Sequence, residues 1–307
     1  MKLIKPKFWK TKNFISFLFY PLSIITYSVY LFKKLSLKKK FAIKTICVGN
    51  IFVGGTGKTS LTIEIKKLLS KKFKTVFIKK KYSNQLDEIN LLKKKGEIIS
   101  LKDRESALLA AKKKNFELAI LDDGLQQKNI NYDLKIICFN TDEGLGNEFM
   151  LPAGPLRESI NELKKYDIAF LNGEKKNNKL LSKLKSINKN LKIFEGRYKP
   201  ENLTNFNRVK KYLMFCGIGN PHEFIKTLVK YKFNIKHKII YPDHYKISNY
   251  EIIKLKEKAK KEGLILITTE KDFFRLDKIE QKNIKFLKVK LEIKNISKFK
   301  KILTAKL

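Results

Sequence analysis

The chain has 307 residues, enough for one large or two ordinary domains with a buried core. Its hydrophobic fraction of 43% is typical of a globular protein and argues against a mainly disordered chain. The 68 Lys and Arg residues against 29 Asp and Glu residues give a formal net charge of +39, which predicts an acidic partner.

The positive charge is mostly lysine and is spread along the whole chain, as an AT-rich coding sequence alone can produce. Nucleic-acid recognition usually adds arginine forks and exposed aromatic side chains over a basic groove. An anionic membrane surface or an anionic substrate is therefore the favoured partner, and no nucleic acid is expected.

The three cysteines, Cys47, Cys138 and Cys216, lie far apart within apolar runs. They form no CxxC pair and no Cys/His ligand cluster, so neither a disulfide framework nor a zinc site is indicated. A reducing, cytoplasmic compartment is expected.

The first distinctive segment, Phe14–Phe32, contains no charged residue and has lysines on both sides. Its polar residues recur at steps of three and four, which places them on one helical face: Ser16, Tyr20, Ser23, Tyr27 and Tyr30. We predict a membrane-associated helix within residues 1–40, either partly embedded or spanning the bilayer. The alternative is a buried helix of a soluble protein, and the flanking lysines leave the orientation undecided.

Strands then alternate with helices, which predicts an α/β fold with a P-loop-type parallel sheet over residues 41–197. The predicted strands are Thr45–Val48, Thr75–Ile78, Leu118–Leu121, Lys135–Phe139 and Ile168–Leu171. The predicted helices are Lys58–Leu69, Arg104–Lys114 and Leu180–Ser186.

A second, smaller α/β domain is predicted over residues 198–307, beginning near Tyr198–Pro200. Its predicted strands are Tyr212–Phe215 and Leu264–Thr268, and its predicted helices are His222–Tyr231 and Asn249–Lys261. His222 and His237 sit in ordinary helix or strand patterns, so neither is assigned a functional role.

A glycine-rich turn between the first strand and the first helix has the composition of a phosphate-binding loop. It runs through Phe52, Val53, Gly54, Gly55, Thr56, Gly57, Lys58 and Thr59. Its backbone N–H groups and the helix start can bind phosphate, Lys58 can reach the β- and γ-phosphates, and the Thr59 hydroxyl can bind Mg²⁺. The usual pattern begins with glycine where this chain has Phe52, which weakens a strict match.

An acidic pair, Asp122 and Asp123, follows the apolar strand Leu118–Leu121. A carboxylate at the end of a strand beside a phosphate loop is expected to bind Mg²⁺, although an Asp-Gly turn alone is common. The string Thr269-Glu270-Lys271-Asp272 has its lysine one place late for a guanine-recognition element, which favours ATP over GTP.

Several strings together resemble the tetraacyldisaccharide 4'-kinase (lipid A 4'-kinase) family. They are Val48-Gly49-Asn50 before the phosphate loop, Asp122–Gln126, Leu151-Pro152-Ala153-Gly154-Pro155-Leu156-Arg157-Glu158, Gly217-Ile218-Gly219-Asn220-Pro221, Asp243-His244 and Thr269-Glu270-Lys271-Asp272. Their order and spread cover nearly the whole chain, and the second and third strings are far more specific than a phosphate loop.

This resemblance implies a membrane-associated P-loop kinase with two α/β domains joined by a hinge. Such an enzyme transfers the γ-phosphate of ATP, with Mg²⁺, to the 4'-hydroxyl of a tetraacyldisaccharide 1-phosphate, a step of lipid A biosynthesis. The implied partners are an anionic glycolipid and the inner membrane surface, on its cytoplasmic face. The oligomeric state is not indicated.

The resemblance also implies site residues. It gives Asp87 the role of catalytic base, although the family's flanking glycine and proline are replaced here by Leu86 and Ile89. It gives His244 the role of assisting that base, which suits the chemistry of a sugar hydroxyl. Asp87 could instead be a solvated loop carboxylate, and His244 a surface histidine after Pro242.

Four further residues complete the implied site. Arg104 is a candidate for charge stabilisation near the phosphates, with a plain helix-start ion pair as the alternative, and Gln126 is a candidate for positioning. Arg157 and Glu158 are expected to contact the substrate head or the domain junction.

Other functions stay open at this point. One is a P-loop kinase of another acceptor, and a second is a nucleic-acid-stimulated ATPase that uses the positive charge. A third is a relative that binds nucleotide without catalysis, suggested by the altered segment around Asp87.

Overall fold

A computed structural model of the protein describes residues 5–82, 86–243 and 245–307. The chain forms two compact units. The larger unit comprises residues 5–82, 92–198 and 291–307. Among the described residues, the smaller unit comprises 86–91 and 199–290. The predicted ranges 41–197 and 198–307 stay a prediction; in the structure the last 17 residues, 291–307, belong to the larger unit.

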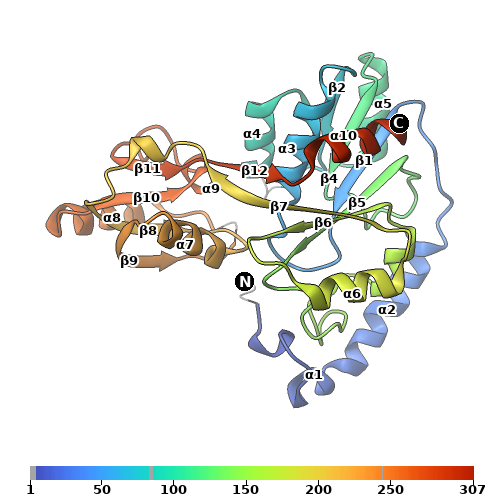
Figure 1. Ribbon diagram of the computed structural model, residues 1–307, viewed down its shortest axis with the longest axis horizontal. Coiled ribbons are helices and arrows are strands. Elements are labelled where there is room, and N and C mark those ends of the chain that lie inside the picture. Colours follow the sequence, from blue (N-terminus) through green and yellow to red (C-terminus); the bar gives the residue numbers. More distant parts are fainter. Residues whose placement is uncertain (1–4, 83–85, 244) are drawn as a thin grey trace. The chain divides into compact units, whose positions relative to one another are not determined.

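The larger unit is built on an eight-stranded sheet in the order β12-β7-β6-β5-β1-β4-β2-β3 (Figure 1). Its strands are β1 (Lys44–Gly49), β2 (Thr75–Ile78), β3 (Ile98–Ile99), β4 (Leu118–Asp122), β5 (Leu134–Asn140), β6 (Ile168–Asn172), β7 (Lys192–Pro200) and β12 (Val289–Ile293). The neighbours from β7 to β3 all pair in parallel. The predicted α/β fold with a parallel-sheet core is therefore confirmed.

The larger unit also contains the helices α1 (Phe14–Leu18), α2 (Tyr20–Lys34), α3 (Lys58–Leu69), α5 (Arg104–Lys113), α6 (Asn178–Ile187) and α10 (Ile296–Ala305), with 3-10 turns at Lys7–Trp9 and Ile160–Lys165. Helix α4 (Leu86–Lys95) begins in the smaller unit and ends in the larger one. Helix α3 packs against β1, β2 and β4, and against α10. The central strands β1, β4 and β5 are almost entirely buried, as near-continuous apolar strands of a covered parallel sheet should be.

The smaller unit has a four-stranded parallel sheet in the order β11-β10-β8-β9. Its elements are β8 (Lys211–Cys216), α7 (Pro221–Lys230), β9 (Asn234–Ile240), α8 (Asn249–Lys261), β10 (Ile265–Thr269), α9 (Glu270–Phe273), β11 (Ile284–Leu287) and a 3-10 turn at Leu203–Asn205. Alternate residues of β8 enter two cores: Tyr212 and Met214 pack with α7, whereas Leu213 and Phe215 pack with α8.

The single helix predicted over Phe14–Phe32 is wrong in detail, because the structure has two helices, α1 and α2, meeting at Phe19 and Tyr20. Pro21 gives the physical reason: it has no N–H to continue the hydrogen bonds of α1, but it is well tolerated in the first turn of α2. Across the described ranges, no helix has the length and apolar character needed to cross a bilayer.

The two helices face the protein with their polar side. Ser16, Ser23 and Tyr30 are buried, whereas Tyr20 and Tyr27 of the predicted polar stripe are exposed. Ser23 Oγ donates to the carbonyl of Met150 at 2.8 Å. Because the polar side is turned inward, the apolar side chains are left on the surface.

Candidate active site

The phosphate-type loop connects β1 to α3, as its sequence predicts. Gly57 caps α3 with a left-handed φ of 87°, a conformation that side chains rarely adopt. A Cβ on Gly57 would also lie 2.6 Å from Nδ2 of Asn172, at the end of β6. Both the backbone angle and the lack of space therefore require glycine at the start of this helix.

The absence of the usual first glycine has a packing reason. Phe52 places its side chain in the core and is only 5% exposed. Its backbone forms an isolated antiparallel bridge with Leu156, and the Val53 N–H donates to the carbonyl of Pro155 at 2.9 Å. The loop is thus held from one side by the segment that precedes Arg157.

Asn50, to which sequence reasoning gave no role, holds the loop from within. Its side chain is fully buried, and Nδ2 donates to the carbonyl of Phe52 at 2.6 Å and to Thr56 Oγ1 at 3.0 Å. Gln126 Nε2 in turn donates to the Asn50 carbonyl at 2.8 Å. The only sequence signal for Asn50 was its place after β1, in one of the strings shared with the family.

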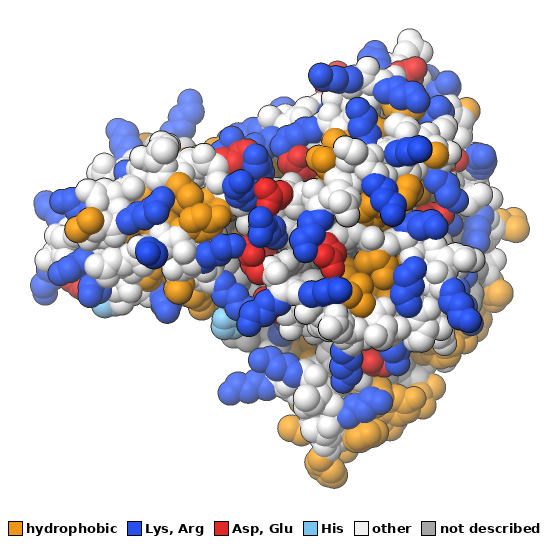
Figure 2. Space-filling model, in the orientation of Figure 1, with side chains coloured by type: hydrophobic (Ala, Val, Ile, Leu, Met, Phe, Trp, Pro, Cys, Tyr) orange, Lys and Arg blue, Asp and Glu red, His pale blue; other side chains and the backbone are white. Residues whose placement is uncertain are grey.

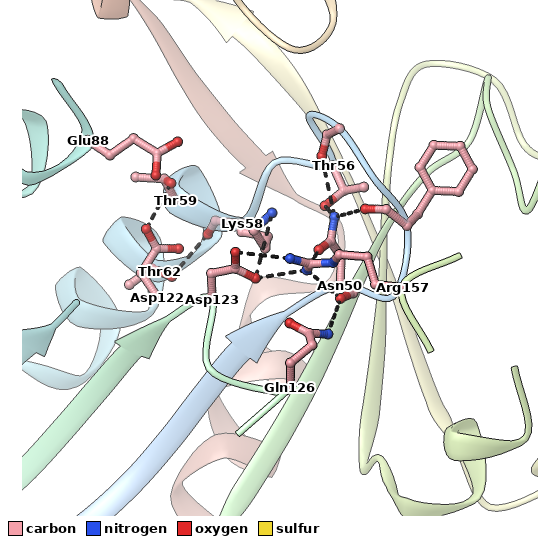
Figure 3. Close-up of polar contacts among 12 residues, drawn as sticks. Asn50, Thr56, Lys58, Thr59, Thr62, Glu88, Asp122, Asp123, Gln126 and Arg157 are labelled. Atoms are coloured by element: carbon pink, nitrogen blue, oxygen red, sulfur yellow. Dashed lines mark hydrogen bonds and ion pairs between the residues drawn. The ribbon is translucent and has the colours of Figure 1, made fainter. Parts of the chain in front are cut away.

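Asp122 lies beside the loop because β1 and β4 are parallel neighbours, with Val48 paired to Asp122. Its carboxylate is buried, and Oδ2 accepts a hydrogen bond from Thr59 Oγ1 at 3.0 Å (Figure 3). The same oxygen accepts a hydrogen bond from Lys79 Nζ at 2.7 Å. The other oxygen, Oδ1, has no partner in the described part of the chain. A hydroxyl and an unpartnered carboxylate oxygen are the ligand types that Mg²⁺ takes, so Thr59 and Asp122 fit the predicted metal site.

Lys79, at the end of β2, was missed by sequence reasoning because nothing in a lysine-rich sequence distinguishes it from its neighbours. Its side chain is 2% exposed, and its partner Asp122 is 0% exposed. A fully buried lysine is rare unless paired, so this ion pair belongs to the construction of the site rather than to a solvated surface.

Asp123 points the other way, toward the cations of the loop (Figure 3). Oδ1 lies 3.9 Å from Lys58 Nζ and 2.9 Å from Arg157 Nη2, and the residue has a left-handed φ of 62°. Burial alone would raise the pKa of Asp123, but Lys58 and Arg157 hold it well below the usual range. Asp123 is therefore ionised, and it keeps Lys58 and Arg157 together beside the loop.

The two predicted arginines contact different groups of Asp123, Arg157 its carboxylate and Arg104 its backbone carbonyl. Arg157 also donates to the Asn50 carbonyl at 2.6 Å. Arg104 is 7% exposed, and it donates to the backbone carbonyl of Asp123 and, at 3.2 Å, to Gln127 Oε1. Arg104 thus holds the backbone of the acidic turn; its predicted charge-stabilising role stays a prediction.

Glu158 lies inside the larger unit, where it is 0% exposed. It accepts hydrogen bonds from the Tyr166 hydroxyl and from Lys128 Nζ. These contacts account for Glu158 as a buried anchor of the segment that carries Arg157.

Asp87, the implied base, belongs to the smaller unit, in the first turn of α4 rather than in a solvated loop. It is buried, and Oδ2 accepts from Arg275 Nη2 at 2.8 Å and lies 3.4 Å from Lys271 Nζ. The implied assisting residue, His244, lies outside the described residues. His237 forms an exposed pair with Glu262, as expected of a histidine without a site role.

A strand, a glycine-rich loop capping a helix, and a buried aspartate on the neighbouring parallel strand are together the features of the P-loop class. The family described as Tetraacyldisaccharide-1-P 4'-kinase matches residues 15–307, and the chain belongs to this family. The predicted family and the predicted enzyme class, a kinase, are thereby confirmed.

Two curated relatives and one solved structure illustrate the similarity. The tetraacyldisaccharide 4'-kinase of Pelagibacter ubique is 46% identical over 300 residues, covering 95% of each chain. That of Rickettsia typhi is 33% identical over 317 residues, covering 96% of each. A crystal structure of LpxK from Aquifex aeolicus in complex with ATP has a TM-score of 0.74 and 24% identity, covers 95% of this chain and 99% of that one, and supports the fold.

Proposed function

We propose that the protein transfers the γ-phosphate of ATP to the 4'-hydroxyl of a tetraacyldisaccharide 1-phosphate, and that it requires Mg²⁺. The observation that carries the proposal is the cluster of Lys58, Asp123 and Arg157 beside Thr59 and Asp122, in a chain of this family. The structure of the Aquifex aeolicus relative, titled as an ATP complex, supports ATP as the donor.

The residues of the larger unit bind the donor. Backbone N–H groups of the loop and the positive end of α3 bind the phosphates. The positive charge of Lys58 attracts the leaving phosphate more strongly as negative charge develops on it. Thr59 and Asp122 would hold Mg²⁺, which neutralises charge on the phosphate oxygens. Asn50 and Asp123 hold the loop, Lys58 and Arg157 in place before the substrate arrives.

The acceptor needs a base. The 4'-hydroxyl oxygen forms a bond to the γ-phosphorus while the bond from that phosphorus to the bridging oxygen breaks, and ADP leaves with the electron pair. The hydroxyl proton passes to a carboxylate, and we assign this role to Asp87. His244 is proposed to assist it, as the family resemblance implies.

The test is transfer of labelled γ-phosphate to a tetraacyldisaccharide 1-phosphate in mixed micelles. A labelled lipid that forms with Mg²⁺ and is lost with EDTA is the expected product. Parallel reactions contain GTP in place of ATP, a non-acylated disaccharide in place of the lipid, or added RNA. A preference for the non-acylated sugar would identify another acceptor, whereas ATP hydrolysis stimulated only by RNA would identify a nucleic-acid-dependent ATPase.

We further propose that α1 and α2 attach the protein to the cytoplasmic face of the inner membrane. Figure 2 shows hydrophobic side chains gathered at the lower right, over these two helices. The most exposed of them are Phe14 at 82%, Leu18 at 65%, Ile25 at 62% and Phe32 at 75%. Apolar side chains on one side of a helix, with lysines nearby, suit the interface of an anionic bilayer.

Aspartate at Phe14, Ile25 and Phe32 together is expected to reduce binding to vesicles of phosphatidylglycerol and phosphatidylethanolamine. Each buried apolar side chain contributes about 1.5–3 kcal/mol, so the partition coefficient should fall by roughly a hundredfold or more. Flotation of the protein with the vesicles measures this. The matched control is Ile279→Asp, an equally exposed apolar residue of the smaller unit, which should leave flotation unchanged. Equal flotation of the triple variant would mean that another surface binds the membrane.

A further inference from the structure

The string Thr269-Glu270-Lys271-Asp272 lacks the spacing of a guanine-recognition element, and the structure shows which contacts its last residue makes. Asp272 is 1% exposed, and Oδ2 accepts hydrogen bonds from Thr269 Oγ1 at 2.7 Å and from the Gly217 N–H at 3.1 Å. Its other oxygen, Oδ1, accepts from Arg275 Nη1 at 2.5 Å. The aspartate thus connects the start of α9 with the glycine-containing turn after β8.

Arg275 is fixed on one edge by these groups. Its Nη1 donates both to Asp272 Oδ1 and to the Gly217 carbonyl, the latter at 2.7 Å. A guanidinium is planar and rigid, so two partners on one nitrogen also fix the direction of its other N–H groups. The arginine side chain is only 12% exposed.

The other edge of this guanidinium holds Asp87. Nε and Nη2 of Arg275 both donate to Asp87 Oδ2, at 3.1 and 2.8 Å. Lys271 Nζ lies 3.4 Å from the same oxygen. Asp87 also lies in the first turn of the ten-residue helix α4, where the helix dipole favours a negative charge.

Lys271, beside Asp87, has further acidic neighbours. Lys271 also pairs with Glu88 Oε1 at 3.0 Å and lies 3.9 Å from Asp243 Oδ1. Burial alone would lower the pKa of Lys271, but Glu88, Asp87 and Asp243 raise it, so this lysine is charged. Burial raises the pKa of Asp272 while Arg275 opposes that effect. His244 follows Asp243 and lies outside the described residues.

We propose that Arg275 is a positioning residue of the phosphate transfer, which fixes the carboxylate of Asp87 in place and holds it ionised. The inference rests on the proposed function, in which Asp87 accepts the proton of the acceptor hydroxyl. Asp272 and Gly217 contribute indirectly, because their hydrogen bonds hold Arg275 in place. The same carboxylate oxygen faces two cations, Arg275 at 2.8 Å and Lys271 at 3.4 Å, so its position and its charge are both constrained.

The test compares Arg275→Met with Arg275→Lys, Asp272→Asn and the control Arg208→Met, an exposed arginine of the same unit. For Arg275→Met we expect kcat to fall by roughly 10- to 100-fold with the KM for ATP unchanged, because the general base contributes about 10²–10⁴-fold in total. Arg275→Lys should recover part of the loss, because it restores a charge without the fork.

The pH profile separates positioning from a purely structural role. Removing a cation from beside a carboxylate raises the pKa of that carboxylate, so a higher pH is needed to ionise it. The acidic limb of the kcat profile should therefore move to higher pH in Arg275→Met and stay in place in Arg208→Met. In an Asp87→Asn background, Arg275→Met should have little further effect on kcat, because the group it acts on is gone.

If a folded Arg275→Met protein has the wild-type kcat and the wild-type acidic limb of the pH profile, the inference is overturned. If Arg275→Met does not fold, the same measurements are made on Arg275→Lys and Asp272→Asn. A wild-type kcat and a wild-type pH profile in both variants would then overturn the inference. If Asp87→Asn keeps full turnover, the base assignment fails and this inference fails with it. If the wild-type protein transfers no phosphate to the lipid, the proposed function itself fails.

Discussion

Replacing Lys58 with alanine is expected to abolish phosphate transfer, with a loss in kcat of about 10²–10³-fold or more. Lys58 begins α3, where loop N–H groups and the helix dipole already favour phosphate. Its ammonium lies 3.9 Å from Asp123 and its side chain is 18% exposed, so it is held close to the loop while staying accessible. Transfer of labelled phosphate at saturating ATP measures the loss.

The matched control is Lys67→Ala, on the same helix. Lys67 is 55% exposed and forms an i,i+3 pair with Glu64, so its removal should leave turnover unchanged. Lys58→Arg keeps the charge but not the compact ammonium, and we expect it to recover little activity. If Lys58→Ala kept more than about a tenth of wild-type turnover, the loop would not be the site at which the γ-phosphate is stabilised.

Much of the sheet that surrounds this loop was predictable because its strands are short, apolar and β-branched. The strand predicted at Thr75–Ile78 and the helix predicted at Lys58–Leu69 have those bounds in the structure. Strands flanking the loop differ by one or two residues at their ends. In a covered parallel sheet a short apolar run predicts the strand itself. It does not fix the first and last residues, because the turns at the strand ends accept many sequences.

Elements without a strong apolar pattern were missed. Strand β9 alternates exposed and partly exposed residues at the edge of its sheet, and two of its four exposed positions are lysines, Lys236 and Lys238. Strand β12 and helix α10 end the chain beside β7 and α3, far from their neighbours in sequence. No local sequence pattern predicts that these C-terminal elements pack beside β7 and α3, because the contacts that stabilise this packing join residues far apart in the sequence.

The N-terminal helices show what periodicity can and cannot give. Steps of three and four correctly placed Ser16, Ser23 and Tyr30 on one face, and these three are buried. Periodicity alone could not show that this polar face would pack inward. The reason lies in the partner: Ser23 Oγ and Thr26 Oγ1 donate to the carbonyls of Met150 and Leu151, in a segment remote in sequence.

The candidate site was predictable where residue type and position along a strand carry the chemistry. Lys58, Thr59 and the acidic pair were found in this way, and the parallel register of β1 and β4 brings them together. Lys79 and Arg275 act instead through buried contacts with residues distant in sequence, and Asn50 acts through contacts that exist only once the loop is folded around it. Such contacts are properties of the packed fold, which spacing does not reveal.

Replacing Asp87 with asparagine is expected to lower kcat by about 10²–10⁴-fold, the usual contribution of a general base, while the KM for ATP stays near that of the wild-type protein. Asparagine keeps the shape of the side chain but cannot take up the hydroxyl proton at neutral pH. The residues proposed to bind the nucleotide belong to the larger unit and Asp87 belongs to the smaller one, so we expect donor binding to persist. Single-turnover transfer, measured beside nucleotide binding, gives both quantities.

The control for this substitution is Glu262→Gln, which removes an exposed acid of the same unit that pairs with His237. It should leave kcat unchanged. Asp87→Asn also removes one anionic partner of Arg275 and of Lys271, which keep Asp272 and Glu88. The loss of stability should therefore be smaller than the roughly 3–5 kcal/mol expected for a buried cation left with no partner. Thermal unfolding therefore has to accompany the kinetics, because a protein that is folded, binds ATP and transfers no phosphate identifies a base. A folded variant with near-normal turnover would mean that Asp87 and Arg275 form a structural ion pair and that another group accepts the proton.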